Sequence, residues 1–107
     1  MLLSLSFSLL VSEARADGAA TYASLCSSCH GAQGAGDGVA AAGLPVKPAN
    51  MTDPAFWNAT RTDDYLKTVI TKGGAAVGKS PLMGPMGASL SDAQLAELIA
   101  YLKTLKK

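Results

Sequence analysis

The chain has 107 residues, 49% of them hydrophobic, and a formal net charge of +1 at pH 7. This length is typical of one domain. A net charge so close to zero, without a basic stripe or interleaved aromatic residues, argues against a nucleic-acid-binding protein and predicts only modest electrostatic steering toward partners.

The first 16 residues differ in character from the rest. An apolar run, MLLSLSFSLLV, is followed by SEARA and then by Asp17. The small-x-small triplet that ends at Ala16 predicts a secretory signal peptide over residues 1–16 and an exported, soluble, periplasmic domain over residues 17–107. The run is too short for a transmembrane segment, which takes about 20 apolar residues. An N-terminal helix of the folded domain is the alternative.

Two helices are predicted in the first part of the domain. Residues 17–26 are rich in Ala and place Tyr22 and Leu25 on one face. A second helix is expected after Thr62, whose side chain suits an N-cap, and is expected to end at the glycine pair 73–74.

The clearest helical signal begins at Ser91. The sequence Ser91-Asp92-Ala93-Gln94 is a capping box, in which Ser91 and Gln94 each bond to the other's backbone. An apolar stripe follows at helical spacing and consists of Leu95, Leu98, Ile99, Leu102 and Leu105.

Long loops join these helices. Residues 31–43 contain five Gly, residues 44–54 contain three Pro, and residues 75–89 are rich in Gly, Pro and Met. A single helical turn is expected over residues 54–59. No segment alternates with period two, so the predicted fold class is all-α with three to five short helices. Such long loops are unusual unless they are functional, and wrapping a flat cofactor would explain them.

The sequence Cys26-Ser27-Ser28-Cys29-His30 is a C-x-x-C-H motif, the pattern of covalent haem attachment. Cys26 and Cys29, on one helical turn, can each add to a vinyl group of one haem, and His30 then supplies the proximal iron ligand. Three other interpretations compete. A structural zinc site needs four ligands, a thioredoxin-like redox pair would lie in a βαβ unit, and a plain disulfide would leave the loops without a core. The motif therefore predicts one covalently bound haem c.

The distal iron ligand has fewer candidates. His30 is the only histidine, so a second histidine ligand from this chain is excluded. Once the predicted signal peptide is removed, the methionines are Met51, Met83 and Met86. Met51 is expected to fill the core. Met83 and Met86 lie in the loop ahead of the last helix, and one of them is expected to reach the iron.

The domain resembles class I cytochromes c in this motif and in the segment LMGPMGASLSDAQLAELIAYLKTL. In that family the ligand Met lies seven positions before the Leu of an L-S-D helix start. Met83 has this relation to Leu90, whereas Met86 lies only four positions before it. The resemblance therefore implies a class I cytochrome c-like fold, wrapped around one haem with Met83 as the distal ligand and Met86 as the alternative.

The resemblance implies three further features. A loop carbonyl accepts a hydrogen bond from the proximal histidine, and Pro48 is expected to provide it, with Pro45 as the alternative. Trp57 resembles an indole that donates to a haem propionate, although a core aromatic is an equal alternative. The first and last helices are expected to cross closely at Gly18 and Tyr101.

These features predict a one-electron carrier between membrane or periplasmic redox partners, acting as a monomer or as a subunit of a complex. Lys47, Lys72 and Lys79 are candidates for orienting a partner at the haem edge. An electron-accepting subunit of a periplasmic oxidoreductase is the second hypothesis, and a haem enzyme or gas sensor with an open sixth site is the third. No nucleophile–base pair or paired carboxylates indicate an enzyme.

Overall fold

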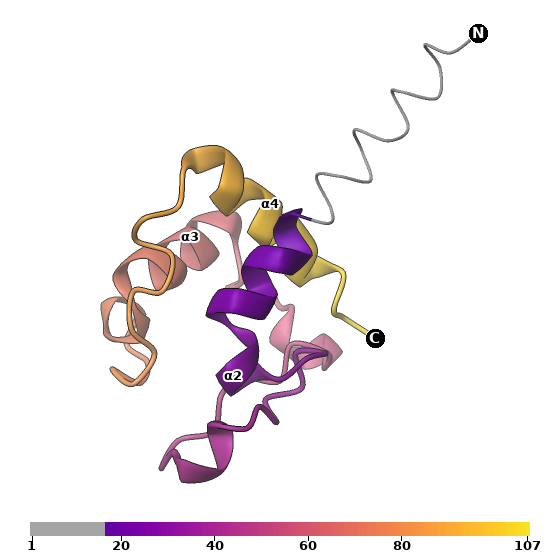
Figure 1. Cartoon of the computed structure of the whole chain (residues 1–107), viewed down its shortest axis with the longest axis vertical. Helices are drawn as coiled ribbons and strands as arrows, with labels where there is room; N and C mark the ends of the chain where they lie inside the picture. Colours follow the sequence, from indigo (N-terminus) through magenta and orange to yellow (C-terminus); the bar gives the residue numbers. More distant parts are fainter. Residues whose placement is uncertain (1–16) are drawn as a thin grey trace, which may run out of the picture.

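The computed structural model describes residues 17–107, so the predicted signal peptide lies outside the described residues. Within this range the regular structure is helical and contains no strand, which confirms the all-α class. A helical segment over residues 17–25 is followed by three α-helices and three 3-10 turns (Figure 1). These are α2 (Ser27–His30), η1 (Ala41–Gly43), η2 (Pro54–Phe56), α3 (Asp63–Lys72), η3 (Gly74–Val77) and α4 (Asp92–Lys103).

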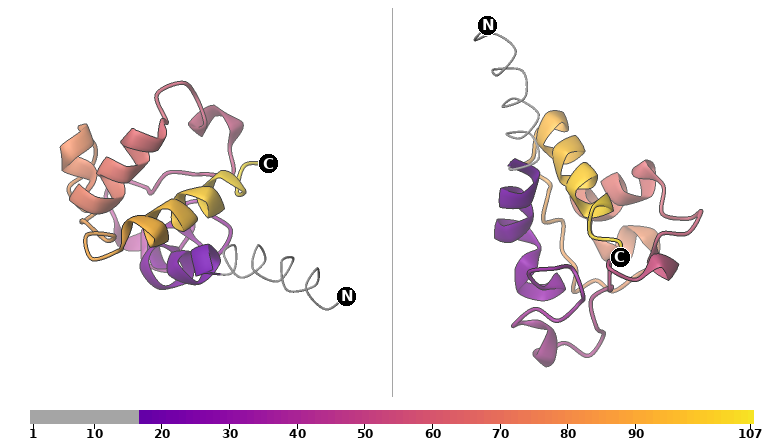
Figure 2. Two further views of the ribbon diagram at one scale, coloured as in Figure 1. Left: turned by 90° about the horizontal axis from the view of Figure 1, so that it is seen from above. Right: turned by 90° about the vertical axis from the view of Figure 1, so that its right-hand side faces the viewer.

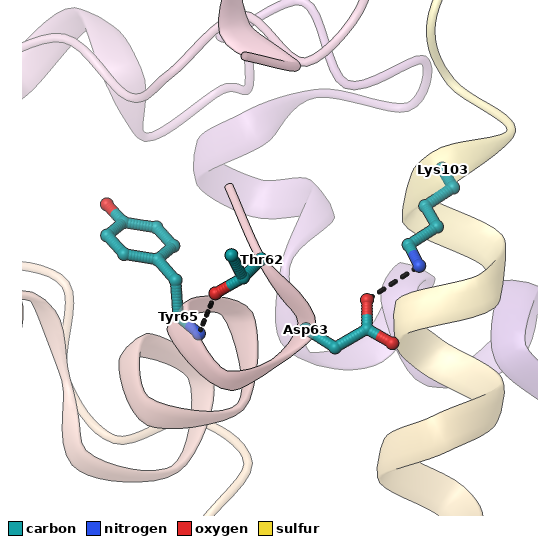
Figure 3. A network of polar contacts seen from close by, with 4 residues as sticks. All are labelled: Thr62, Asp63, Tyr65 and Lys103. Atoms are coloured by element: carbon teal, nitrogen blue, oxygen red, sulfur yellow. Dashed lines mark hydrogen bonds and ion pairs between the residues drawn. The ribbon is translucent and has the colours of Figure 1, made fainter. Parts of the chain in front are cut away.

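The two longest of these helices begin where the sequence predicts. The Thr62 hydroxyl caps α3 by accepting a hydrogen bond from the Tyr65 amide at 3.1 Å (Figure 3). At α4 the capping box is complete. The Gln94 amide donates to the Ser91 hydroxyl at 3.1 Å, and the Ser91 amide donates to the Gln94 side chain at 2.9 Å. Local sequence therefore sets both starting points.

Residues 17–25 and α4 cross at close range and lie side by side in Figures 1 and 2. A Cβ atom added to Gly18 would lie 2.5 Å from the Glu97 carbonyl oxygen and 3.1 Å from the Tyr101 Cβ. The ring centroids of Tyr22 and Tyr101 are 5.3 Å apart beside this crossing. The predicted contact is confirmed, because only a residue without a side chain lets the two backbones approach so closely.

One hydrophobic core joins the helices. Its buried side chains come from α3, from α4 and from the segments around residues 22 and 51, and they are Tyr22, Met51, Leu66, Val69, Ile70, Leu95, Leu98, Ile99 and Leu102. Met51 is only 5% exposed and thus fills the core as expected. Cys26, Trp57 and Met83 border this core, so three of the predicted site residues share its edge.

An ion pair also links α3 to α4. The Lys103 Nζ and an Asp63 carboxylate oxygen lie 2.6 Å apart at the surface (Figure 3). Both side chains are largely exposed, so the pair contributes little to stability. Among the helices of residues 17–107, none is both long enough and apolar enough to span a membrane.

Candidate functional site

The C-x-x-C-H residues lie on one helical turn. Cys26 caps the short helix α2, which contains Cys29 and His30. The His30 amide donates to the Cys26 carbonyl at 2.9 Å, which places His30 one turn beyond Cys26. The two cysteines are half-buried and are not joined in a disulfide. Their spacing on the turn matches the requirement that both thiols reach one porphyrin edge.

The environment of the Cys26 thiol disfavours a negative charge on sulfur. Burial, together with a smaller contribution from charge on Cys29, raises the pKa of the Cys26 thiol to about 11. A thiolate is therefore disfavoured here. Addition of a thiol across a vinyl group consumes the S–H bond and gives an uncharged thioether, which can occupy a half-buried position without a desolvation penalty for charge. The two cysteines thus fit a covalently attached haem.

The imidazole of His30 is oriented by the backbone of a distant loop. Its Nδ1 lies 3.2 Å from the Ala49 carbonyl oxygen. This contact assigns the ring proton to Nδ1 and leaves the Nε2 lone pair for a metal. Burial lowers the pKa of His30, and the hydrogen bond to Ala49 opposes that effect. The neutral, metal-binding form is therefore the favoured one.

The acceptor of this hydrogen bond is Ala49 and not Pro48, which corrects the sequence-based expectation by one residue. The Pro48 carbonyl points elsewhere: a Cβ added to Gly36 would lie 2.6 Å from its oxygen. Gly36 has φ +81 and donates its amide to the His30 carbonyl at 2.8 Å. The glycine-rich loop therefore takes up the space in front of Pro48, and the next carbonyl faces His30. Neither Pro48 nor its alternative Pro45 makes the contact.

Tyr22 holds the end of the motif, a role that the sequence did not reveal. Its hydroxyl donates to the Gly31 carbonyl at 2.7 Å, and the side chain is 2% exposed. Gly31 follows His30 directly and has φ +88, where the chain leaves α2. The hydrogen bond therefore fixes the turn that follows the imidazole. Nothing in the local sequence connects Tyr22 with a residue nine positions later.

We expect the Tyr22→Phe variant to lose about 1–3 kcal/mol of unfolding free energy, because the buried Gly31 carbonyl would lose its donor. Tyr65→Phe is the matched control, since the Tyr65 hydroxyl has no hydrogen bond within residues 17–107. Denaturant titration of both haem-loaded variants measures the difference. Equal stabilities would contradict a structural role for the Tyr22 hydroxyl.

The same variant has a pH signature. Burial raises the pKa of Tyr22 from 10.0 to about 12, with smaller contributions from Cys26, Tyr101 and Asp37. Because the folded pKa is the higher one, the contribution of Tyr22 to stability is complete below pH 10 and is lost as the pH rises through 12. The stability of Tyr22→Phe is therefore expected to fall less steeply over this alkaline range.

The two methionines ahead of α4 differ in the burial of their side chains. Met83 is half-buried against the core, and its carbonyl accepts a hydrogen bond from the Gly74 amide at 2.8 Å. Met86 is 47% exposed. The loop is tied down again beyond it, where the Gly87 amide donates to the Ile70 carbonyl at 2.8 Å. Met83 is thus the better packed of the two candidate methionines.

Trp57 fits the second of its two expected roles, that of a core aromatic. Its indole Nε1 donates to the Met51 carbonyl at 2.8 Å, and its ring packs edge-on against Phe56 with centroids 5.0 Å apart. The Asp53 side chain caps η2 by accepting from the Ala55 amide at 2.9 Å, and this turn brings the indole back toward Met51. The indole N–H is thus used by the backbone, and Trp57 is a packed aromatic at the edge of the core.

Comparison of the chain with known protein families gives one match. The model described as "Cytochrome C oxidase, cbb3-type, subunit III" covers residues 13–102, which include the C-x-x-C-H motif, both candidate methionines and nearly all of α4. The comparisons with curated proteins and with solved structures gave no match.

Proposed function

Because the chain belongs to the cbb3-type cytochrome c oxidase subunit III family, and is thus a class I c-type cytochrome with covalently bound haem c, we propose that it is a periplasmic carrier of single electrons. The haem supplies an iron that cycles between its ferrous and ferric states. The observation that carries the proposal is the α2 turn, where two half-buried thiols precede an imidazole whose Nδ1 is already bonded. This turn would attach one haem through Cys26 and Cys29 and bind its iron through His30.

Met83 is the proposed distal ligand. Its thioether sulfur is soft and uncharged, and methionine paired with histidine raises the reduction potential of cytochromes c. The backbone hydrogen bond to Gly74 and the packing against the core support a fixed position for this side chain. A filled distal position would keep small molecules from the iron, which suits electron transfer better than catalysis.

Redox proteins of the membrane or periplasm are the proposed partners. Large exposed apolar side chains support a protein-docking role for the loops. Val46 lies in the loop that contains Ala49, Leu82 and Met86 lie in the loop that contains Met83, and Val39 precedes η1; all four are 47–93% exposed. The lysines considered for docking, Lys47, Lys72 and Lys79, are exposed as well. Because most lysines are exposed, this observation favours none of the three as a docking residue. The family description names an oxidase subunit, so an electron-accepting subunit of an oxidoreductase complex is the second candidate.

The test is to produce the full chain in cells that contain haem-ligation machinery. We expect a red protein with one iron per chain, a haem that survives denaturation, and reversible one-electron reduction. Cys26→Ala and Cys29→Ala are expected to lose haem, and Ser28→Ala, in the exposed middle of the motif, is the matched control. A colourless product with free or disulfide-bonded cysteines would overturn the proposal. Co-purification with a catalytic protein would favour the subunit over the free carrier.

A further inference from the structure

Residues 105–107, which follow α4, fold back onto two loops near the haem-attachment motif. Leu105 packs against the edge of the core, and a Cβ added to Gly34 would lie 2.7 Å from the Leu105 Cδ1. Lys107 donates its backbone amide to the Thr52 carbonyl at 2.9 Å. In Figures 1 and 2 the segment accordingly runs from the end of α4 toward η2. These three residues form a strap that contacts both the glycine-rich loop and the loop before η2.

The two loops beneath the strap are bonded to each other. The Met51 amide donates to the Gly34 carbonyl at 2.7 Å, and both residues are buried. The Gly34 amide in turn donates at 3.2 Å to the carbonyl of Gly31, the residue directly after His30. Leu105 therefore packs on the residue through which the glycine-rich loop bonds to Met51.

A side-chain turn restrains the loop before η2 between Ala49 and Thr52. The Asn50 Oδ1 accepts hydrogen bonds from the Thr52 amide at 3.0 Å and from the Thr52 hydroxyl at 2.6 Å. The carbonyl of Ala49, the residue before Asn50, lies 3.2 Å from the His30 Nδ1. The carbonyl that the strap bonds and the carbonyl that orients the imidazole thus belong to one short, internally bonded piece of chain.

Ala49 depends on its neighbours for its position. Its side chain is a single exposed methyl group, which adds no packing that would fix the carbonyl. Exposed loops are mobile unless burial or backbone bonds tie them down. The ties on this loop include the burial of Met51, its bond to Gly34, and the bond from Lys107 to Thr52. The strap contributes to the last two of these three.

We propose that the strap is a positioning element for the proximal ligand: it keeps the Ala49 carbonyl on the His30 imidazole and so helps to set the reduction potential of the iron. A hydrogen bond at Nδ1 raises the basicity of the imidazole as a ligand. A more basic ligand stabilises ferric iron, so a looser bond should make the potential more positive. The inference rests on the proposed haem attachment and assigns positioning roles to Leu105 and to the Lys107 amide.

The test uses haem-loaded protein, whose absorption spectrum establishes covalent attachment before the strap is examined. Lys107→Pro removes the amide donor, and it breaks no helical hydrogen bond because α4 ends at Lys103. In the reduced, diamagnetic protein we expect the His30 Nδ1–H to exchange with solvent on the order of tenfold faster, as for the loss of one hydrogen bond. Its proton resonance should move upfield, and the midpoint potential should become more positive. Lys107→Ala, which removes the same side chain and keeps the amide, is the matched control and should leave all three measurements unchanged.

Leu105→Ala removes the other contact of the strap. It should move the exchange rate, the resonance and the potential in the same direction as Lys107→Pro, and Leu105→Met, of similar volume, should return them toward the parent values. Leu95→Ala is the control for a loss of stability alone, because Leu95 is buried near the opposite end of α4. It should lower the free energy of unfolding and leave the His30 resonance and the potential unchanged.

The outcomes separate a positioning role from a structural one. If Lys107→Pro and Leu105→Ala change only the free energy of unfolding, with the His30 proton and the potential as in their controls, the proposal is overturned while the haem attachment stands. If no haem is attached, the absorption spectrum shows that the proposed function has failed first, and the inference fails with it.

Discussion

Replacing Met83 with alanine in the haem-loaded protein is expected to abolish the charge-transfer band between thioether sulfur and ferric iron and to lower the reduction potential. The axial ligand moves haem potentials over a range of about 0.8 V, so losing a methionine that favours the ferrous state should cost on the order of 0.1 V. Near-infrared absorption and a redox titration measure the two effects. The open position should also let carbon monoxide bind to the ferrous protein.

Met86→Ala is the matched control for this prediction. Each variant removes one thioether group from the same loop. Met83 packs against the core, whereas Met86 is 47% exposed. The Met86 variant should therefore keep the band and the potential. If the band disappears from the Met86 variant and persists in the Met83 variant, the distal ligand is reassigned to Met86. Persistence of the band in both single variants would contradict a unique methionine ligand.

The helices could be predicted from the sequence because short-range chemistry determines them. Ser91 and Gln94 form their reciprocal bonds within one turn, and Thr62 caps α3 in the same local way. One boundary differed. The apolar stripe was expected to continue to Leu105, but α4 ends at Lys103. The Thr104 hydroxyl donates to the Tyr101 carbonyl at 2.6 Å, and Leu105 packs against the core from beyond the helix end.

The contacts around the site could not be predicted in the same way, because they depend on the paths of loops. The Ala49 carbonyl faces His30 while Gly36 lies against the Pro48 carbonyl, and both relations depend on how the two loops pass each other. The partner of Trp57 depends on the turn at η2. Neither relation has a periodic signal in the sequence. The motif residues themselves were identifiable because their chemistry requires a fixed local spacing.

Arg61 is the clearest residue that sequence analysis missed. An arginine just before a helix cap is ordinary in sequence, and nothing there distinguishes it from a solvated side chain. Its environment becomes informative only when the rings of Phe56 and Tyr65 are seen on the guanidinium and its Nε is found buried without a partner. Burial and an unsatisfied donor are properties of the fold, so the environment of Arg61 could emerge only from the structure.

The glycine-rich loop contains a position where even a methyl group should disrupt the haem-attachment helix. The Gly38 amide donates to the Cys29 carbonyl at 3.1 Å, and the Ala40 amide donates to the Ser28 carbonyl at 2.9 Å. A Cβ added to Gly38 would overlap the Ser28 carbonyl oxygen and lie 2.7 Å from the Cys29 carbonyl carbon. These neighbours are backbone atoms of α2 and cannot rotate away. The loop or the helix would have to move.

We therefore expect Gly38→Ala to lower the free energy of unfolding by about 3 kcal/mol, near the upper end of overpacking effects, and to reduce the yield of haem-loaded protein. Gly43→Ala is the matched control, because a Cβ there meets no atom within 4 Å and the position does not have a positive φ. Gly43→Ala lowers the conformational entropy of the unfolded chain as Gly38→Ala does. Its free energy of unfolding should therefore stay unchanged or rise by up to about 1 kcal/mol. Denaturant titrations and haem absorbance per chain compare the two. If Gly38→Ala matched Gly43→Ala in both, the loop would not be seated on the backbone of the C-x-x-C-H turn as described.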